Sequence, residues 1–334
     1  MLYKTIVFSN APLLKGFRYK NIFQLVPFFY GNNAPLSMYA SHFPLFLEYE
    51  AEAIGEKTYV EEYLIEKGFD DKIVKDSRYV PNQERVKCEI LNLLTSLTNF
   101  RFFSYKEGGR WAVQTPNKII GDLSDEEKSK LNNQVSHWCI PAYVYPGLKQ
   151  DLEIKAFTQC SEYYTTFEDI RSYFTINPNI ENNPEVKFPS NFDFCINQYF
   201  SEKDDLRLRI KHCMGLLADG IALFDTKRSV SLLTIVSSIE GMAKIDYDLY
   251  GQVKGLGAKA RFVRYLKKYV AGRSEEKYVS YYKKRCSITH EGELFLGDID
   301  IYAEPKQQNE DWLLRLEIQQ IARLALYDWL IRVK

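Results

Sequence analysis

Hydrophobic residues repeat at helical spacing through most of the second half of the chain. Over residues 204–224, apolar side chains recur every three or four positions, as at Leu206, Ile210, Met214 and Leu217. Residues 229–245 are apolar almost all round, which is typical of a helix buried at the centre of a bundle. Three further helices are expected at 258–271, 274–289 and 309–331. The pattern therefore predicts an all-helical bundle.

The first half shows shorter apolar runs, separated by turn residues and prolines. Residues 3–8 and 23–30 have the composition of short strands. Residues 101–105 and 110–113 are expected to pair as a hairpin around Glu107-Gly108-Gly109. One clear helix is predicted at 82–99, and shorter elements are expected as helices at 57–67, 124–133 and 167–173 and as an extended segment at 139–148.

A stretch rich in turn residues separates these two patterns. Residues 177–191 contain three prolines and five asparagines, which sustain neither a helix nor a central strand. A loop or linker is therefore expected there. The chain of 334 residues is long enough for two domains. The predicted fold class is α+β, with a mixed α/β region at 1–190 followed by an all-α bundle at 191–334.

Overall composition excludes several classes of protein. The six cysteines are scattered without a CxxC pair, which argues against a zinc ribbon or a disulfide framework. No signal peptide and no run of ~18 apolar residues is present, so neither export nor membrane insertion is expected. These features predict a cytoplasmic protein without a metal or other cofactor.

Charge is balanced overall but concentrated locally. The chain has 44 basic and 44 acidic residues, yet residues 254–285 hold eleven lysines and arginines against two glutamates, a net charge of +9 (11 − 2). Tyrosines interleave with these cations, a combination that suits nucleic-acid phosphates and bases. A solvated helix face with tyrosines in the core is the alternative. The candidate RNA contacts are Lys259, Arg261, Arg264, Lys267, Lys268, Lys283 and Lys284.

An arginine and a histidine end this basic segment. Histidine exchanges protons near neutral pH, and the planar guanidinium of arginine binds phosphate oxygens. Arg285 and His290 together would supply what phosphodiester cleavage requires. In an ideal helix their side chains would lie ~140° apart, so His290 must turn back at a helix end. Gly292 provides a helix stop just beyond it.

One carboxylate lies within the most apolar predicted helix. Glu240 is expected to be paired, because a buried acid is seldom left without a partner. An arginine or histidine of a neighbouring helix is one candidate. A structural ion pair with Lys244, or an exposed position, is the other, and the sequence leaves both open.

These residues resemble the motif of the HEPN superfamily of helical domains, and most closely its Apea-like branch from bacterial defence-type proteins. The string Arg285-Cys-Ser-Ile-Thr-His290 matches the family's Arg-x(4–6)-His motif, and Gly292 follows as is usual there. Leu232-Leu233-Thr-Ile-Val-Ser-Ser-Ile-Glu240 matches its glutamate-bearing apolar helix. The resemblance covers roughly residues 200–334. Cys286 departs from the polar residue that often follows the arginine.

The resemblance implies a metal-independent endoribonuclease whose site forms where two bundles dimerise. His290 would be the general acid/base, Arg285 would stabilise the phosphorane, and Glu240 would orient one of them. Ser287 and Thr289 would add hydrogen bonds. The expected role is a toxin-like effector in prokaryotic anti-phage defence or abortive infection, with an unknown trigger or ligand at the N-terminal region. The alternatives are a non-catalytic HEPN scaffold that binds nucleotide, nucleic acid or protein, and a nucleic-acid-binding regulator.

Overall fold

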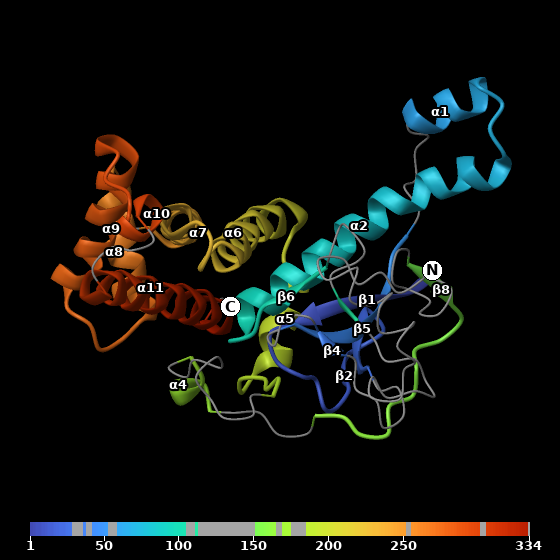
Figure 1. The fold of residues 1–334 in the computed structure, drawn as a ribbon, viewed down its shortest axis with the longest axis horizontal. Coiled ribbons are helices and arrows are strands. Elements are labelled where there is room, and N and C mark those ends of the chain that lie inside the picture. The colour runs from blue at the N-terminus through green and yellow to red at the C-terminus, as the bar shows by residue number, and fades with distance from the viewer. Residues whose placement is uncertain are drawn as a thin grey trace, which may run out of the picture. The chain divides into compact units, whose positions relative to one another are not determined.

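An antiparallel sheet forms the N-terminal part of the protein in a computed structural model (Figure 1). The structure describes residues 1–28, 36–37, 42–52, 59–104, 111–112, 151–164, 169–174, 185–251, 255–300 and 305–332. The chain divides into two compact units. The first comprises Met1–Leu91, Phe102–Thr166 and Pro178–Val186, and the second comprises Asn92–Arg101, Phe167–Asn177 and Lys187–Lys334.

The sheet of the first unit has the order β2-β3-β5-β1-β6, and β8 also pairs with β1. Its strands are β1 (Leu2–Ser9), β2 (Phe17–Tyr19), β3 (Phe23–Pro27), β5 (Phe43–Glu50), β6 (Phe102–Phe103) and β8 (Leu152–Ile154). The central pair, β1 and β5, is antiparallel over eight residue pairs, from Leu2 opposite Glu50 to Ser9 opposite Phe43. A separate two-stranded ladder joins β4 (Leu36–Ser37) to β7 (Trp111–Ala112).

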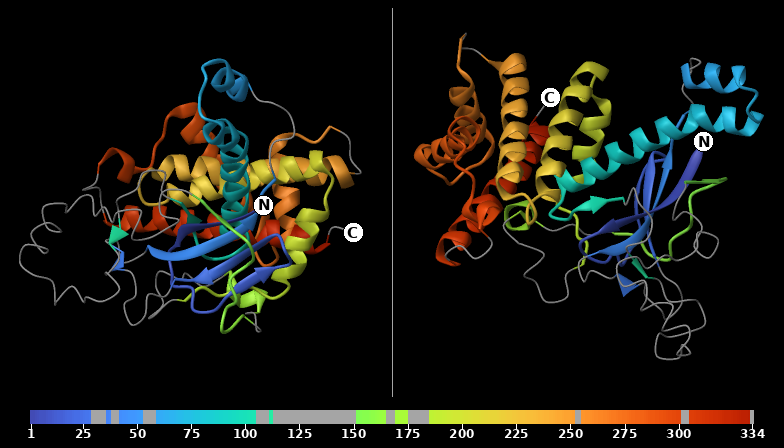
Figure 2. Two further views of the ribbon diagram at one scale, coloured as in Figure 1. Left: turned by 90° about the vertical axis from the view of Figure 1, so that its right-hand side faces the viewer. Right: turned by 45° about the horizontal axis from the view of Figure 1, so that its top comes forward.

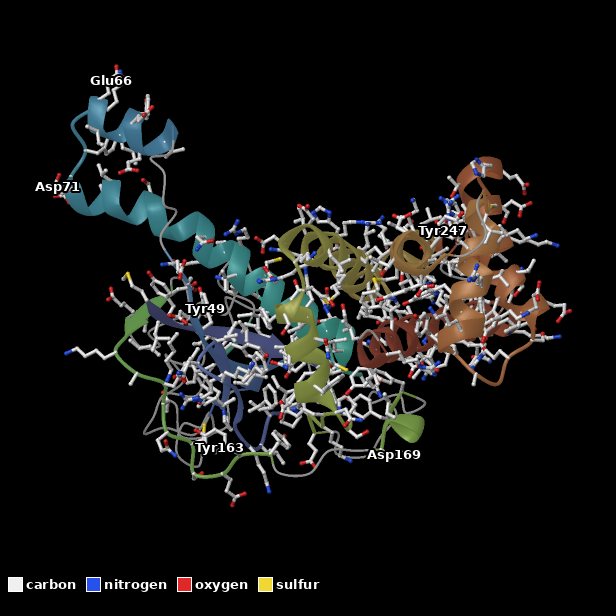
Figure 3. The ribbon with its side chains drawn as sticks, turned by 180° about the vertical axis from the view of Figure 1, so that it is seen from behind. Tyr49, Glu66, Asp71, Tyr163, Asp169 and Tyr247 are labelled. Atoms are coloured by element: carbon white, nitrogen blue, oxygen red, sulfur yellow. The ribbon has the colours of Figure 1, made fainter. Side chains whose placement is uncertain are left out.

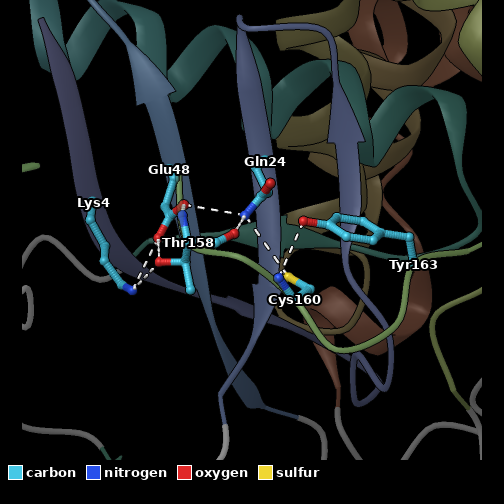
Figure 4. Close-up of polar contacts among 6 residues, drawn as sticks. All are labelled: Lys4, Gln24, Glu48, Thr158, Cys160 and Tyr163. Carbon is cyan, nitrogen blue, oxygen red and sulfur yellow. Dashed lines mark hydrogen bonds and ion pairs between the residues drawn. The ribbon is translucent and has the colours of Figure 1, made fainter. Parts of the chain in front are cut away.

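A buried polar cluster lies on one face of this sheet (Figure 4). The strand register places Lys4 and Gln24 directly opposite Glu48, on its two sides. Lys4 Nζ lies 3.0 Å from Glu48 Oε1, and the backbone N–H of Thr158 donates to Glu48 Oε2 at 2.8 Å. The Gln24 amide donates to the Thr158 carbonyl at 2.7 Å. These contacts hold the segment after β8 against the sheet.

Two helices complete the described part of the first unit. They are α1 (Tyr59–Glu66) and the long α2 (Asp71–Leu97), whose last six residues belong to the second unit. Figure 2 shows α1 folded back beside the beginning of α2. The expected helix at 82–99 is thus part of a longer one, which starts at Asp71 and continues through Pro81. Ile90, Leu93 and Leu94, which lie in the predicted part of this helix, are buried.

The predicted hairpin between residues 101–105 and 110–113 is wrong. β6 pairs with β1, whereas β7 pairs with β4, so the two strands do not pair with each other. Local turn residues indicated a two-stranded hairpin, but β6 instead extends the edge of the larger sheet. The expected elements at 124–133 and 139–148 lie outside the described residues. The helix expected at 167–173 is described only as α4 (Ile170–Tyr173).

The second unit is helical, which together with the sheet confirms the α+β class. Its elements from Phe192 onward are α5 (Phe192–Ser201), α6 (Asp204–Ala222), α7 (Arg228–Tyr250), α8 (Ala258–Tyr269), α9 (Glu275–Cys286), the π-helical turn η2 (Ser287–Glu291), α10 (Leu296–Ile299) and α11 (Pro305–Arg332). α7 is central, because α6, α8, α9 and α11 all pack against it. α11 begins at Pro305, four residues before the predicted start at 309, and proline suits the first helical position.

Close approach between α6 and α7 depends on two glycines. A Cβ added at Gly220 would lie 2.5 Å from Ile235, and one added at Gly241 would lie 2.5 Å from the Cys213 sulfur. Two serines of α7 use this proximity. Ser231 donates to the Gly220 carbonyl at 2.6 Å, and Ser238 donates to the Cys213 carbonyl at 2.7 Å. α7 is therefore held against α6 both by close packing at the two glycines and by the two serine hydrogen bonds.

The N-terminus of α7 is capped by a residue far away in the sequence. The Asp298 carboxylate accepts hydrogen bonds from the backbone N–H groups of Arg228 and Ser229, at 2.9 and 2.6 Å. Burial alone would raise the pKa of Asp298, but these hydrogen bonds outweigh it and hold the pKa below its ordinary value. The lowered pKa shows that the charged carboxylate is the stabilising form.

Asp298→Ala is expected to lower the free energy of unfolding by about 1–2 kcal/mol near neutral pH, as loss of a helix cap does. Because the folded-state pKa is depressed, the contribution is complete above the ordinary aspartate pKa of about 3.9 and is lost as the pH falls through the lower folded pKa. Urea unfolding near pH 7 and near pH 3 measures this. Glu310→Ala, at an exposed site, is the control, and an equal deficit at both pH values would contradict the prediction.

Candidate active site

The carboxylate of α7 and the arginine of α9 form an ion pair. Arg285 Nε lies 3.5 Å from Glu240 Oε2, and the two side chains are 23% and 18% exposed. Of the two partners that the sequence left open for Glu240, the structure has the arginine of a neighbouring helix. Lys244 contacts Asp248 instead. Both side chains are thus partly exposed, although the Arg285 Nε atom itself is buried and has no hydrogen-bond partner among the described residues.

Tyr282 joins this pair from one turn earlier in α9. Burial raises its pKa first, followed by the negative charge of Glu240, and a hydrogen bond to that carboxylate acts in the same direction. Its ring packs edge-on against Phe262 of α8, with the centroids 5.5 Å apart. Tyr282 is one of the tyrosines that interleave with the basic residues, but its contact with Glu240 was not predicted from the sequence. Its position three residues before Arg285, on the same helix face, is the signal that would have identified it.

A π-helical turn follows Arg285 and changes the register of the motif. The N–H of Gly292 donates to the Ser287 carbonyl, five residues earlier, and Gly292 has φ 70°, in the left-handed region. Two hydroxyl groups donate hydrogen bonds to backbone carbonyls at the end of α9. Thr289 Oγ1 donates to the Arg285 carbonyl at 2.8 Å, and Ser287 Oγ donates to the Lys284 carbonyl at 3.2 Å. The predicted helix stop at Gly292 and the predicted helix start at Ser274, which accepts from the Lys277 N–H, are confirmed.

The π turn has a consequence for His290. An i→i+5 turn is wider than an α turn, so residues five apart rotate toward one helix face, and their angular separation falls from ~140° to below about 100°. π turns of this kind occur frequently at functional sites. His290 is exposed on the turn and makes no hydrogen bond or ion pair with the described residues. The structure therefore brings Arg285 and Glu240 together, and leaves His290 exposed on the turn that follows Arg285, without a hydrogen bond or ion pair to either residue.

Basic side chains cover the outward face of α8. Arg261, Arg264, Lys267 and Lys268 follow helical spacing there, opposite the buried face formed by Phe262, Val263, Tyr265, Leu266 and Tyr269. Arg261 donates to the Leu256 carbonyl at 2.8 Å, Lys267 contacts Glu275 at 2.7 Å, and Lys268 contacts Asp246 at 2.8 Å. The expected combination of tyrosines and cations is thus present, but the tyrosines of α8 are core residues.

Five of the seven candidate cations form no ion pair with the described residues. They are Lys259, Arg261, Arg264, Lys283 and Lys284. Lys284 lies over the ring of Phe295, 5.0 Å from its centroid. Cations without a charged partner on α8 and α9, together with the partly exposed Arg285, suit a ligand with several phosphates.

The remaining histidines lie elsewhere. His42 packs edge-on against Phe103 of the sheet, with ring centroids 4.8 Å apart. His212 is exposed on α6, and His137 lies outside the described residues. Among the described residues, no group of three or more His, Cys, Asp or Glu side chains is placed to hold a metal ion.

None of the helices in the described part of the chain combines the length and apolarity needed to cross a bilayer. Comparison of the chain with protein-family models, with curated proteins and with solved structures gave no match.

Proposed function

We propose that the helical unit is a metal-independent endoribonuclease of the HEPN type. The observation that supports this most is the partly exposed Arg285–Glu240 pair, followed by a π turn that presents an exposed His290. The proposed biological role is a cytoplasmic toxin-like effector in anti-phage defence. That role and the homodimer through the bundle rest on the motif resemblance alone.

The proposed reaction uses the RNA itself as nucleophile. His290 accepts the proton of a ribose 2′-hydroxyl and returns it to the departing 5′-oxygen, as general acid/base catalysis requires. The 2′-oxygen forms a bond to phosphorus while the bond from phosphorus to the 5′-oxygen breaks. Arg285 stabilises the charge that develops on the phosphorane oxygens. Glu240 and Tyr282 hold the guanidinium in place, and the products carry a 2′,3′-cyclic phosphate and a 5′-hydroxyl.

A binding scaffold is the second candidate function. It is favoured by the contact of Glu240 with Arg285, which already balances the charge of the guanidinium, and by the lack of direct contact between Arg285 and His290. In that case the unpaired cations would hold nucleic acid without cleaving it.

RNA cleavage by the purified full-length protein in the presence of EDTA tests the proposal. Wild type is expected to produce 2′,3′-cyclic phosphate ends, and a variant carrying both Arg285→Ala and His290→Ala is expected to produce none. Circular dichroism and sedimentation confirm that the variant is folded and keeps its association state. Equal cleavage by the variant, or RNA binding without cleavage by wild type, would reject the nuclease proposal.

Thr289→Val is expected to lower kcat roughly tenfold with little change in KM, because a displaced catalytic group reacts more slowly. Valine keeps the β-branched shape but cannot donate to the Arg285 carbonyl, so the turn that presents His290 loosens. Thr289→Ser retains the hydroxyl and serves as the matched control. Steady-state kinetics of both variants give the comparison, and equal loss in both would show that the hydroxyl is not the cause.

A further inference from the structure

The α1–α2 hairpin of the first unit is defined by its own sequence. Gly68 adopts a left-handed conformation, with φ 68°, directly after α1. The Gly68 N–H donates to the Ile65 carbonyl and the Phe69 N–H donates to the Leu64 carbonyl, both at 3.0 Å. This pair of bonds is the Schellman motif that ends helices. The hairpin therefore presents its side chains from a well-formed turn.

Large apolar side chains gather on the outside of this hairpin. Five of them are between 47% and 54% exposed within fourteen residues, a density that no other part of the described chain reaches: Val60, Tyr63, Ile65, Phe69 and Ile73. Val60 and Tyr63 are three residues apart and share one helix face. An exposed apolar surface of this kind marks an interaction site.

Acidic residues border the apolar surface. Residues 59–73 contain five acids and two lysines, a net charge of −3 (2 − 5). Glu62, Glu66, Asp70 and Asp71 are exposed. Figure 3 shows Glu66 and Asp71 at the outer end of the hairpin, directed away from the rest of the unit. Two such hairpins would repel each other, so the expected partner is basic.

The second unit carries a surface of the complementary kind. The outward face of α8 is basic, and Leu249 and Tyr250 at the end of α7 are 45% and 42% exposed. Lys268 lies over the Tyr250 ring, 5.0 Å from its centroid, so cations and exposed apolar groups are adjacent there. Glu62 and Glu66 are four residues apart and Arg264 and Lys267 are three residues apart, so each pair lies on one face of its helix.

We propose that the α1–α2 hairpin of one copy binds the basic outward face of α8 on a second copy. Charge complementarity selects this partner, because the chain is neutral overall but has a strongly basic segment and an acidic hairpin. The contact is heterologous, since a different surface is used on each copy. Association of this type continues head to tail into rings or larger assemblies.

Charge reversal followed by sedimentation velocity tests the contact without RNA, so the result does not depend on the nuclease proposal. One variant carries Glu62→Lys and Glu66→Lys, and the other carries Arg264→Glu and Lys267→Glu. Each alone is expected to weaken self-association at least about tenfold, because like charges then meet across the interface. The proposed homodimer through the helical units would persist in both variants. The measured quantity is therefore the formation of species larger than this dimer.

Combining the two charge-reversed surfaces, either in a mixture of the variants or in one chain, gives the decisive comparison. An equimolar mixture of the two variants, and a single chain carrying all four substitutions, are both expected to regain wild-type association. Tyr63→Ser with Phe69→Ser should abolish association, whereas Leu313→Ser, at an equally exposed site on α11, should not. The proposal is overturned if wild type shows no concentration-dependent association, or if the mixture remains as dissociated as each variant alone.

Discussion

His290→Ala is expected to lower kcat for RNA cleavage by about 10²–10⁴-fold while changing KM little, as loss of a general acid/base does. The imidazole is exposed and makes no hydrogen bond or ion pair with the described residues, so the effect on folding is expected to be small. Steady-state cleavage of a defined RNA, with the unfolding free energy measured in parallel, checks the prediction. His212→Ala, which removes an exposed imidazole from α6, is the matched control.

Arg285→Lys tests how the protein contacts the phosphate that is cleaved. Lysine keeps the positive charge but loses the planar donors that contact two phosphate oxygens together. Kinetics close to wild type would indicate that charge alone suffices, whereas a loss approaching that of His290→Ala would support a directed contact. A His290→Ala variant that cleaves as fast as wild type would exclude the proposed mechanism, whatever the result at Arg285.

Helices α6, α7, α8, α9 and α11 could be predicted because apolar residues repeat along them at helical spacing, whereas the same pattern did not predict α5 and α10. The apolar repeat of α6 and the all-round apolarity of α7 indicated a central helix with neighbours on several sides, which the packing confirms. Helix ends were predictable where local chemistry determines them, as with the Ser274 cap and the left-handed Gly292. α11 begins four residues before the predicted start at 309, because Pro305 occupies the first position of the helix.

The interactions that tie distant residues together could not be predicted. Glu240 had two candidate partners in the sequence, and only the packing of α9 on α7 decides between them. The π turn is accompanied by hydrogen bonds from the Thr289 hydroxyl and the Gly292 N–H to carbonyls at and after the end of α9. The Arg-x-x-x-x-His spacing alone does not predict these bonds. The strand order was similarly hidden, because β6 and β7 lie on either side of a turn-rich stretch yet pair with different partners.

The Glu48 cluster is another interaction of this kind, and it carries the largest expected effect on stability. Lys4→Met is expected to lower the free energy of unfolding by about 3–5 kcal/mol, because it leaves a buried carboxylate without a counter-charge. The Glu48 side chain is 0% exposed, and Lys4, which is 20% exposed, is its cationic partner at 3.0 Å. Its other described partners, Gln24 and Thr158, are neutral donors. Urea unfolding of the full chain, followed by circular dichroism, measures the loss.

Lys15→Met provides the matched control, because it removes the same type of cation from an exposed pair. Lys15 lies 3.2 Å from Glu162, and the two side chains are 47% and 67% exposed, so water replaces the lost partner. It is expected to lower the free energy of unfolding by at most about 1 kcal/mol.

The double variant Lys4→Met with Glu48→Gln removes both charges and should recover a large part of the loss, since no buried charge then remains. A double variant no more stable than Lys4→Met alone would show that the loss comes from packing against Phe46, whose ring centroid lies 4.3 Å from Lys4 Nζ, and that the ion pair is not its cause.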